Sequence, residues 1–162
     1  MQKIQTYITN NRRQVKGALY YKVQDTPDGR VLVAEHDGHL CWLGFDLDPQ
    51  SLLNRFPAAT LQERSENIDL GAAPLCLYGT EFQIKVWQRL LKIKAGTTLS
   101  YLDIARDIGH ERAVRAVGSA VGANPVSVVV PCHRVLPRSG GVGHYLWGAE
   151  QKERLLKAEG AL

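Results

Sequence analysis

The chain has 162 residues, of which 44% are hydrophobic, 22% charged and 7% aromatic, the composition of a globular protein with one large domain or two small ones. The first fourteen residues contain two adjacent arginines and no apolar run for a signal peptide, and no run in the chain reaches the ~20 apolar residues that cross a bilayer, so secretion and membrane insertion are not expected. The three cysteines show no CxxC spacing, which favours reduced thiols in the cytoplasm and argues against a zinc site or a redox motif.

The positive charge is concentrated in the second half of the chain. Residues 1–80 contain 8 Lys and Arg against 9 Asp and Glu, a net charge of −1, whereas residues 81–162 contain 12 against 7, a net charge of +5. This asymmetry suggests a polyanion such as nucleic acid as the partner of the second half, although a solvated surface can carry the same excess by chance.

The first half predicts an antiparallel sheet followed by a short helix. Residues 18–23, 30–35 and 39–45 are rich in Val, Leu, Tyr and Trp, and the Asp-Gly pairs of TPDG and HDGH between them supply the positive φ of short hairpins. In DPQSLLNRF, Asp48 is the expected N-cap of a helix that Pro57 ends.

No chemical cluster is expected in this half. Cys41 and Cys76 lie in apolar runs and are predicted to be small buried side chains, while His36 and His39 flank a turn and are predicted to face solvent. Residues 64–80 have the least pattern and are the best candidate for a linker.

Beyond this stretch the hydrophobic period changes from two to about 3.6, which predicts helices. A capping box of Thr80 and Gln83 begins the first helix, which is expected to end near residues 95–96. Ser100 is the predicted N-cap of a second helix with Leu102, Ala105 and Ile108 as its apolar stripe and Gly109 just past its end.

A third helix is expected to begin directly after His110 and Glu111 and to run to about Gly122, and together with the second it has the proportions of a helix-turn-helix. The spacing of Arg112, Arg115, Ser119 and Gly122 places them on one face, which is basic at one end and nearly flat at the other. Such a face suits phosphates or base edges, and packing of small residues against another helix is the alternative.

The stretch SVVVPCHRV predicts a buried strand at residues 126–130 that stops at Pro131. Because neighbouring residues of a strand point to opposite faces, Cys132 and His133 can pair only if the chain turns there or a water joins them. A thiol beside an imidazole and Arg134 is expected to have a lowered pKa and to act as a nucleophile, and a core cysteine next to a surface histidine is the alternative.

The second half resembles the O6-alkylguanine-DNA alkyltransferases, also called methylated-DNA–protein-cysteine methyltransferases. The similarity runs from Gly79 to Gly160 and includes, in order, GTEFQIKVWQRL, GTTLSYLDIA, RAVGSAVGANPVSVVVPCHRV, SGGVGHYLWG and KERLLKAEG. The resemblance implies an α/β (α+β) fold: an N-terminal antiparallel-sheet domain with a helix over residues 1–78, ribonuclease-H-like, and a mainly helical domain over residues 79–162 that contains a winged-helix-like helix-turn-helix. Residues 1–78 match only in general pattern.

The resemblance also implies the reaction. Cys132 accepts the alkyl group from O6 of guanine and also from O4 of thymine. His133 removes the thiol proton through a water, and Glu159 orients His133. Asn124 braces the turn between the recognition helix and the active-site segment. The product is a thioether, so the protein acts once, as a monomer, with neither cofactor nor metal.

The DNA contacts follow from the same resemblance. The target nucleotide of double-stranded DNA is rotated out of the stack, and Arg115 fills its place, with Arg112, Ser119 and Gly122 on the same face. Tyr101 contacts the flipped nucleotide and donates toward the ring as guanine leaves.

The remaining pocket residues lie after the nucleophile. The carbonyls of Cys132 and Val135 are implied to hold the guanine amino group, and the loop around Tyr145 and Leu146 closes over the base with Lys152 nearby. Trp147 stands where many members have a small residue, which predicts a narrowed pocket that reacts well with methyl groups and slowly with bulky groups such as benzyl.

Three other functions fit the sequence less well. A lesion-binding alkyltransferase-like protein lacks the cysteine of the PCHR motif, which is present here as Cys132. A helix-turn-helix regulator needs a sensor domain and long polar side chains on its recognition helix, for which the chain has little room. A Cys-His hydrolase needs an oxyanion hole that nothing in the sequence indicates.

Overall fold

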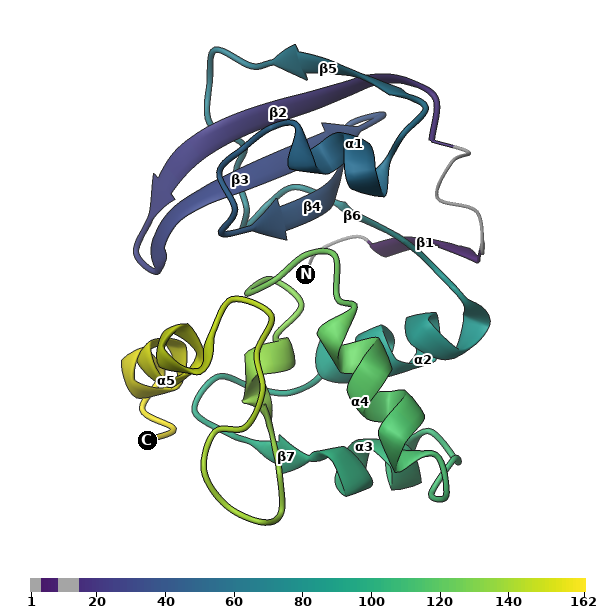
Figure 1. The fold of residues 1–162 in the computed structure, drawn as a ribbon, viewed down its shortest axis with the longest axis vertical. Coiled ribbons are helices and arrows are strands. Elements are labelled where there is room, and N and C mark those ends of the chain that lie inside the picture. Colours follow the sequence, from purple (N-terminus) through teal and green to yellow (C-terminus); the bar gives the residue numbers. More distant parts are fainter. Residues whose placement is uncertain (1–3, 9–14) are drawn as a thin grey trace. The chain divides into compact units, whose positions relative to one another are not determined.

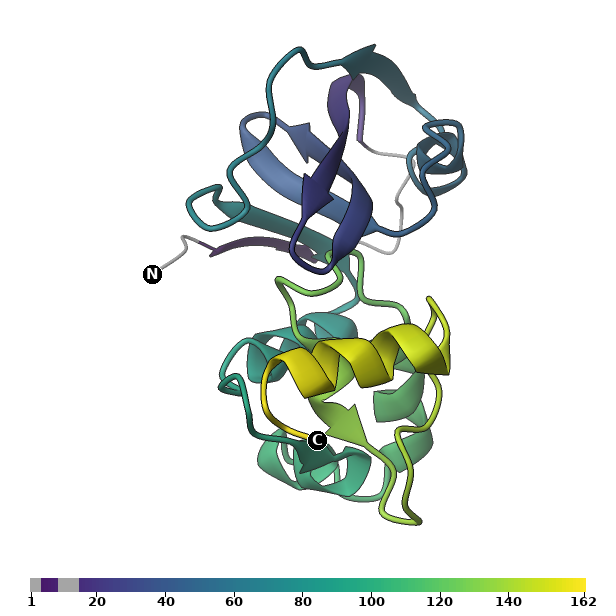
Figure 2. The same cartoon turned by 90° about the vertical axis from the view of Figure 1, so that its left-hand side faces the viewer.

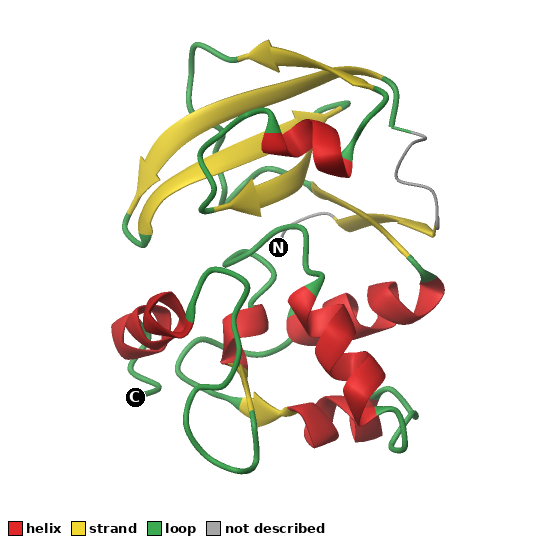
Figure 3. Cartoon of the chain, viewed as in Figure 1, coloured by secondary structure: helices red, strands yellow, loops and turns green. Residues whose placement is uncertain are grey.

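The computed structural model describes residues 4–8 and 15–162, and the chain divides into two compact units, Met1–Glu81 and Phe82–Leu162. Strands dominate the first unit and helices the second, as Figures 1 and 3 show, so the molecule is of the mixed α/β class that the sequence predicts. No helix in the described part of the chain is long and apolar enough to span a bilayer.

The first unit is a six-stranded twisted sheet in the order β1-β6-β4-β3-β2-β5 (Figure 2). Its strands are β1 (Ile4–Ile8), β2 (Gly17–Thr26), β3 (Gly29–His36), β4 (His39–Gly44), β5 (Ala59–Glu63) and β6 (Leu75–Gly79). The predicted antiparallel meander is confirmed for β2, β3 and β4, which pair in antiparallel register. The expectation of a wholly antiparallel sheet is wrong, because β6 pairs with β1 and β4, and β5 with β2, in parallel register. Asp37 and Gly38 both adopt positive φ in the second turn, as the Asp-Gly pair requires.

The helix α1 (Ser51–Arg55) packs on one face of this sheet. Leu52 and Phe56 join Leu19, Leu32 and Cys41 in a buried apolar cluster. The predicted N-cap is wrong: the cap position is Gln50, and the Asp48 carboxylate instead accepts a hydrogen bond from the Gln50 backbone N–H at 3.0 Å in the turn before the helix.

The predicted linker over residues 64–80 is wrong at its C-terminal end. Residues 75–79 form strand β6, which lies inside the sheet between β1 and β4. Its residues Leu75, Cys76 and Leu77 are at most 2% exposed, so the apolar run LCL carried a strand signal that the preceding Gly and Pro residues obscured.

The second unit is built from α2 (Glu81–Leu90), which starts at the boundary, α3 (Tyr101–Asp107), α4 (Val114–Gly122), the 3-10 helix η2 (Cys132–Arg134) and α5 (Ala149–Ala158). Two short parallel strands, β7 (Leu99–Ser100) and β8 (Val135–Leu136), pair between them. The Trp87 indole N–H donates to the Ala120 carbonyl at 2.8 Å and fastens α2 to α4 in the core. Helix α2 ends at Leu90, five residues before the predicted end, because the chain tightens there into turns such as Ile93 N–H to Leu90 O at 3.0 Å.

Helix α3 begins as predicted and α4 does not. Ser100 and Asp103 form a reciprocal capping box, with distances of 3.0 and 2.8 Å. The buried face of α3 centres on Ile104 and Ala105, while the predicted stripe residues Leu102 and Ile108 are only half-buried.

Helix α4 starts at Val114, which leaves Arg112 in the turn before it. The helical spacing that placed Arg112 on the face of Arg115, Ser119 and Gly122 therefore does not apply to Arg112.

The predicted strand at residues 126–130 is absent; the segment is a compact turn with a single bridge between Ser127 and Val130. The Asn124 side chain causes this, because its oxygen accepts from the Val126 N–H at 3.0 Å and its amide donates to the Val130 carbonyl at 2.7 Å. Val128 adopts a φ of +71°, rare for a β-branched residue. The side chains of Val126 and Val130 are fully buried and those of Val128 and Val129 are half-buried, so the apolar run predicted burial only in part and backbone conformation wrongly.

Candidate active site around Cys132

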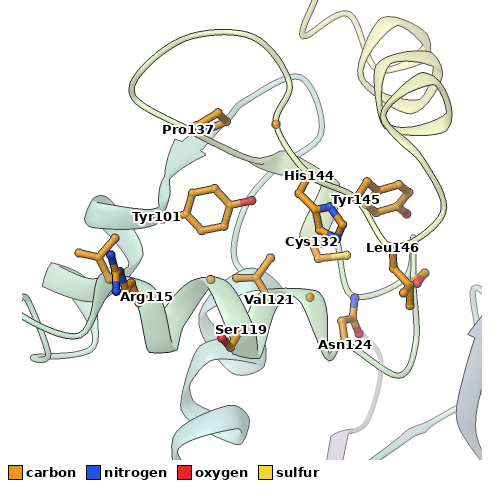
Figure 4. Close-up of a pocket in the computed structure, with 15 residues that line it drawn as sticks. Tyr101, Arg115, Ser119, Val121, Asn124, Cys132, Pro137, His144, Tyr145 and Leu146 are labelled. Atoms are coloured by element: carbon orange, nitrogen blue, oxygen red, sulfur yellow. The ribbon is translucent and has the colours of Figure 1, made fainter.

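A cavity of about 720 Å³ in the second unit contains the candidate nucleophile (Figure 4). One side comes from α3 and α4, the floor from the turn after α4 and from Cys132, and the other side from the loop of residues 137–148, which we call the pocket loop. The lining residues are Tyr101, Val114, Arg115, Gly118, Ser119, Val121, Gly122, Asn124, Ser127, Cys132, Pro137, Gly143, His144, Tyr145 and Leu146.

Cys132 is the first residue of η2, and its side chain is 6% exposed. The expected turn after Pro131 is present: the Cys132 N–H donates back to the Val130 carbonyl at 2.8 Å, and the Arg134 N–H to the Pro131 carbonyl at 3.1 Å. This turn, rather than a strand end, aims the thiol at the cavity.

The thiol is not activated at rest. Burial raises the pKa of Cys132 above its ordinary value, and this effect outweighs a hydrogen bond from the Asn124 side chain and the positive charge of Lys152, which lower it. The predicted lowering of the thiol pKa by His133 and Arg134 is therefore wrong, because a sequence does not show how deeply a thiol is buried.

His133 and Glu159 are brought together, 26 residues apart in the sequence. The fully buried imidazole holds the Glu159 Oε1 atom through Nε2 at 2.8 Å. Because an ionised carboxylate only accepts, this bond places the proton of a neutral ring on Nε2. Burial raises the pKa of Glu159, but the hydrogen bonds and charges of Arg134 and His133 together hold it below its ordinary value, so the carboxylate is ionised.

Arg134 clamps the same carboxylate, and sequence reasoning missed this contact. Its Nε donates to Glu159 Oε2 at 3.0 Å and its Nη2 to Oε1 at 2.8 Å, while Nη1 donates to the Ile93 carbonyl. These two hydrogen bonds keep the positive charge of Arg134 beside the Glu159 carboxylate whether or not His133 is protonated. The motif PCHR was the sequence signal that could have revealed this contact, because its arginine directly follows the histidine that pairs with Glu159.

Lys152 is 1% exposed, and its Nζ donates to the carbonyls of Val135 at 2.7 Å and His144 at 3.2 Å. Burial lowers the pKa of Lys152 to about 8, against a smaller opposing effect of Cys132. The ammonium thus lies close enough to the thiol to favour thiolate, although it does not line the cavity.

Tyr101, at the start of α3, lines the cavity, and burial followed by the charge of Cys132 raises the pKa of its hydroxyl, which keeps it a proton donor. Arg115, Ser119 and Gly122 on α4 are exposed and line the same cavity, whereas Arg112 is exposed in the preceding turn and does not.

The pocket loop contributes Tyr145, 6% exposed, and Leu146, 53% exposed. Trp147 does not line the cavity among the described residues; its indole N–H donates to the Ser127 hydroxyl at 2.8 Å. Val135 does not line it either, and its carbonyl accepts from Lys152. His144 and Pro137 also line the cavity, and the sequence analysis predicted neither, although His144 lies within the SGGVGHYLWG motif.

The other two cysteines, with His36 and His39, lie in the first unit. Cys41 and Cys76 are buried, as predicted. His36 is not in solvent: its side chain is 14% exposed, with Nδ1 3.2 Å from the Tyr78 hydroxyl and Nε2 3.0 Å from the Lys16 carbonyl. Within residues 4–8 and 15–162, no three His, Cys, Asp or Glu side chains gather as metal ligands.

The chain is similar to known proteins over most of its length. The family described as 6-O-methylguanine DNA methyltransferase, DNA binding domain, matches residues 81–161. The inducible methylated-DNA–protein-cysteine methyltransferase of Bacillus subtilis is 36% identical, with 89% of this chain and 92% of the relative covered. The regulatory protein ada of Salmonella typhimurium is 40% identical over 88% of this chain, which spans 46% of that longer protein.

Solved structures agree with these relatives. Mycobacterium tuberculosis OGT in complex with DNA superposes with a TM-score of 0.72 at 33% identity, covering 88% of this chain and 93% of that one. The O6-methylguanine-DNA methyltransferase of the archaeon Pyrococcus kodakaraensis gives a TM-score of 0.63 at 25% identity, covering 88% and 99%. With a matching fold, a family domain over half the chain and a buried cysteine facing a cavity, this protein belongs to the methylated-DNA–protein-cysteine methyltransferase family, and its second unit contains that family's DNA-binding domain.

Proposed function

We propose that the protein repairs double-stranded DNA by moving an alkyl group from O6 of guanine, or O4 of thymine, to Cys132 in a single irreversible turnover. One observation carries the proposal: Cys132 faces a cavity with Tyr101 and Arg115 on its wall, and the next residue is the buried His133, which is paired with Glu159. A stacked base cannot present its O6 substituent in line to a buried thiol, so the nucleotide must be flipped into the cavity.

The reaction begins from a protonated thiol, because burial disfavours the thiolate. His133 takes the thiol proton, directly or through a water, and Glu159 with its Arg134 clamp stabilises the resulting imidazolium. The Asn124 amide and the Lys152 ammonium stabilise the thiolate as it forms. The sulfur then bonds to the alkyl carbon as the carbon–O6 bond breaks.

The bonding electrons pass to guanine, which takes up a proton and leaves as the ordinary base. We assign the donation of this proton to the Tyr101 hydroxyl, which lines the cavity. The proton that His133 took from the thiol replaces the one that Tyr101 gives up, so no proton is gained or lost overall. The Cys132 carbonyl accepts from the Val135 N–H and keeps one lone pair for the guanine amino group, whereas the fully buried Val135 does not line the cavity and its carbonyl accepts from Lys152.

On the DNA side, α3 and α4 act as a helix-turn-helix of winged-helix type, and Arg115 enters the duplex to fill the place of the flipped base. The exposed, flat surface of Ser119 and Gly122 supports this role because it lets the helix approach the DNA backbone. Arg112 contacts a phosphate from the preceding turn. The protein works as a monomer in the cytoplasm.

Stoichiometry tests the proposal. A fixed amount of protein is mixed with increasing amounts of a duplex that contains one O6-methylguanine. We expect the number of repaired duplexes to rise to one per protein molecule and then stop, since a thioether is not cleaved by water. Continued repair beyond one per protein, or none at all, would contradict it.

A further inference from the structure

Cys41 and Cys76 are neighbours in the sheet of the first unit. Strands β4 and β6 run parallel side by side, and Leu40 pairs with Leu75. The next residue of β4 is Cys41 and the next residue of β6 is Cys76, so the two cysteines follow in the same register. Because successive side chains of a strand alternate between its faces, both thiols lie on the face opposite that pair. Both residues are at most 2% exposed, and both thiols are free.

Contacts on the two strands identify this shared face. Cys41 belongs to the buried apolar cluster that contains Leu52 of α1. Tyr78 lies two residues after Cys76, on the same face of β6, and packs against that cluster too. Burial raises the pKa of Cys41, and the charge of a Cys76 thiolate raises it further, more than any other charge does. The two sulfur atoms are therefore close on the α1 side of the sheet.

The spacing of the strands suits a disulfide bond. Neighbouring strands of a sheet lie about 4.8 Å apart, and the Cα atoms of a disulfide are about 4.4–6.8 Å apart. Since Cys41 and Cys76 already share a face and a register, the bond needs no shift of β6 along β4.

Cys76 has the hydrogen-bond partners of a thiol that can lose its proton. Burial raises the pKa of Cys76, and a hydrogen bond from the Tyr78 side chain lowers it. The Tyr78 hydroxyl lies 3.2 Å from His36 Nδ1, and His36 Nε2 lies 3.0 Å from the Lys16 carbonyl. Because a carbonyl only accepts, Nε2 carries the proton of the neutral ring and Nδ1 accepts from Tyr78. This chain of hydrogen bonds leads the Cys76 proton through Tyr78 to His36.

We propose that Cys41 and Cys76 are an oxidation site, at which a hydroperoxide converts the two thiols to a reversible disulfide bond between β4 and β6. The inference goes beyond the proposed function and does not involve Cys132. The sequence has no CxxC motif, and the fold brings the two cysteines together without one.

The chemistry has two steps. The Cys76 thiolate attacks one oxygen of hydrogen peroxide and becomes a sulfenic acid, and the other oxygen leaves as water after taking up the thiol proton. The Cys41 sulfur then displaces the sulfenic oxygen, which leaves as a second water with the Cys41 proton. In total, two thiols and one hydrogen peroxide give one disulfide and two waters, so the O–O bond takes up the two electrons that the thiols lose.

The oxidant reaches the pair from the edge of the sheet. The outermost strand on this side is β1, and β6 lies directly beside it. Local opening of β1 uncovers Cys76, while the closed sheet keeps both thiols buried. The disulfide then ties β6 to β4 until a thiol reductant takes its place by exchange.

The test is to treat the reduced chain with hydrogen peroxide, block the remaining thiols and digest with trypsin without reductant. Arg55 separates Cys41 from Cys76, and Arg115 separates Cys76 from Cys132, so each cysteine is on its own peptide. We expect one peptide pair joined through Cys41 and Cys76, lighter by two hydrogen atoms than the two free peptides and separated again by dithiothreitol. Free Cys41 and Cys76, oxidation of either one to a sulfinic acid without the bond, or a bond to Cys132 in its place would overturn the proposal.

Tyr78→Phe tests Cys76 as the attacking thiol. The variant keeps the ring, which packs edge-on against Phe56 with 6.1 Å between the centroids. We expect disulfide formation to slow about five-fold, the factor that one ordinary hydrogen bond contributes. Tyr21→Phe is the matched control, because Tyr21 packs against the same cluster from β2, and it should oxidise at the rate of the unmodified protein. Equal rates in the two variants would overturn the role of Cys76 as the attacking thiol.

Discussion

At the scale of single residues, Cys132 is a protonated thiol whose neighbours stabilise the thiolate once it has formed. Burial raises the pKa of Cys132, and Asn124 and Lys152 lower it by less. A neutral thiol at rest protects the cysteine from adventitious electrophiles, because the thiolate is the reactive form. The sequence predicted Cys132 as the nucleophile, with His133 and Arg134 as its neighbours, but the sign of the pKa shift depends on burial, which only the fold determines.

Glu159→Gln tests the relay. The amide keeps the shape of the carboxylate but no longer stabilises an imidazolium, so we expect methyl transfer to slow by about 100-fold, the lower range for a general-base contribution. The rate is measured with an O6-methylguanine duplex. Glu153→Gln, on the exposed side of the same helix and paired with Lys157, is the control and should react as the unmodified protein does. Equal rates for both variants would remove Glu159 from the mechanism.

Lys152→Met tests the buried ammonium through stability. The pKa of Lys152 is about 8 in the folded protein and 10.5 in a solvated side chain. Between these values the unfolded chain binds a proton that the folded chain has released, so the lysine's cost to stability disappears as the pH rises through this window. We expect the free energy of unfolding, measured in urea and taken relative to Lys152→Met, to rise from pH 8 to 10. Lys157→Met removes an exposed lysine from the same helix as a control, and a flat or falling difference would contradict the assignment.

At the scale of elements, helix caps and turns position the site more than long helices do. Tyr101 owes its place to the Ser100–Asp103 capping box, and Cys132 to the turn that Asn124 closes. The meander, the Ser100 cap and the burial of Val126 and Val130 were predictable from local patterns. The turn at residues 126–130 was not, because one buried amide outweighs the strand propensity of four valines, and strand β6 was hidden by the glycine and proline residues before it.

Ser100→Ala tests the cap. Losing the hydrogen bond from the Asp103 N–H is expected to lower the free energy of unfolding by about 1 kcal/mol, the usual value of an N-cap. Urea denaturation measures the change. Ser100→Thr keeps the hydroxyl and should recover most of the loss, whereas equal stability of the alanine and serine proteins would show that the cap contributes nothing.

At the scale of the whole molecule, the uneven charge agrees with the division into two units. The excess of positive charge lies in the half that contains the family's DNA-binding domain, and residues 1–80 are close to neutral. The family motifs were predictable because they are contiguous in sequence. The Arg134 clamp and the Trp147 contact were not, since each joins segments 20 or more residues apart.

Salt dependence of binding to undamaged duplex tests the DNA face. Arg112→Ala and Arg115→Ala each remove one cation, so each should lower the slope of log Kd against log salt by about one if it contacts a phosphate. Arg115→Ala should in addition slow repair in a duplex far more than reaction with free O6-methylguanine, which needs no flipping. Equal slowing of both reactions would remove Arg115 from the flipping step.

The most direct measurement is the mass of the peptide that contains Cys132 after incubation with a duplex bearing O6-methylguanine. The account predicts one added methyl group on this peptide, none on the peptides of the buried Cys41 and Cys76, and no repair by Cys132→Ala. A methyl group on another residue, an unmodified Cys132 peptide alongside repaired DNA, or repair by Cys132→Ala would contradict it.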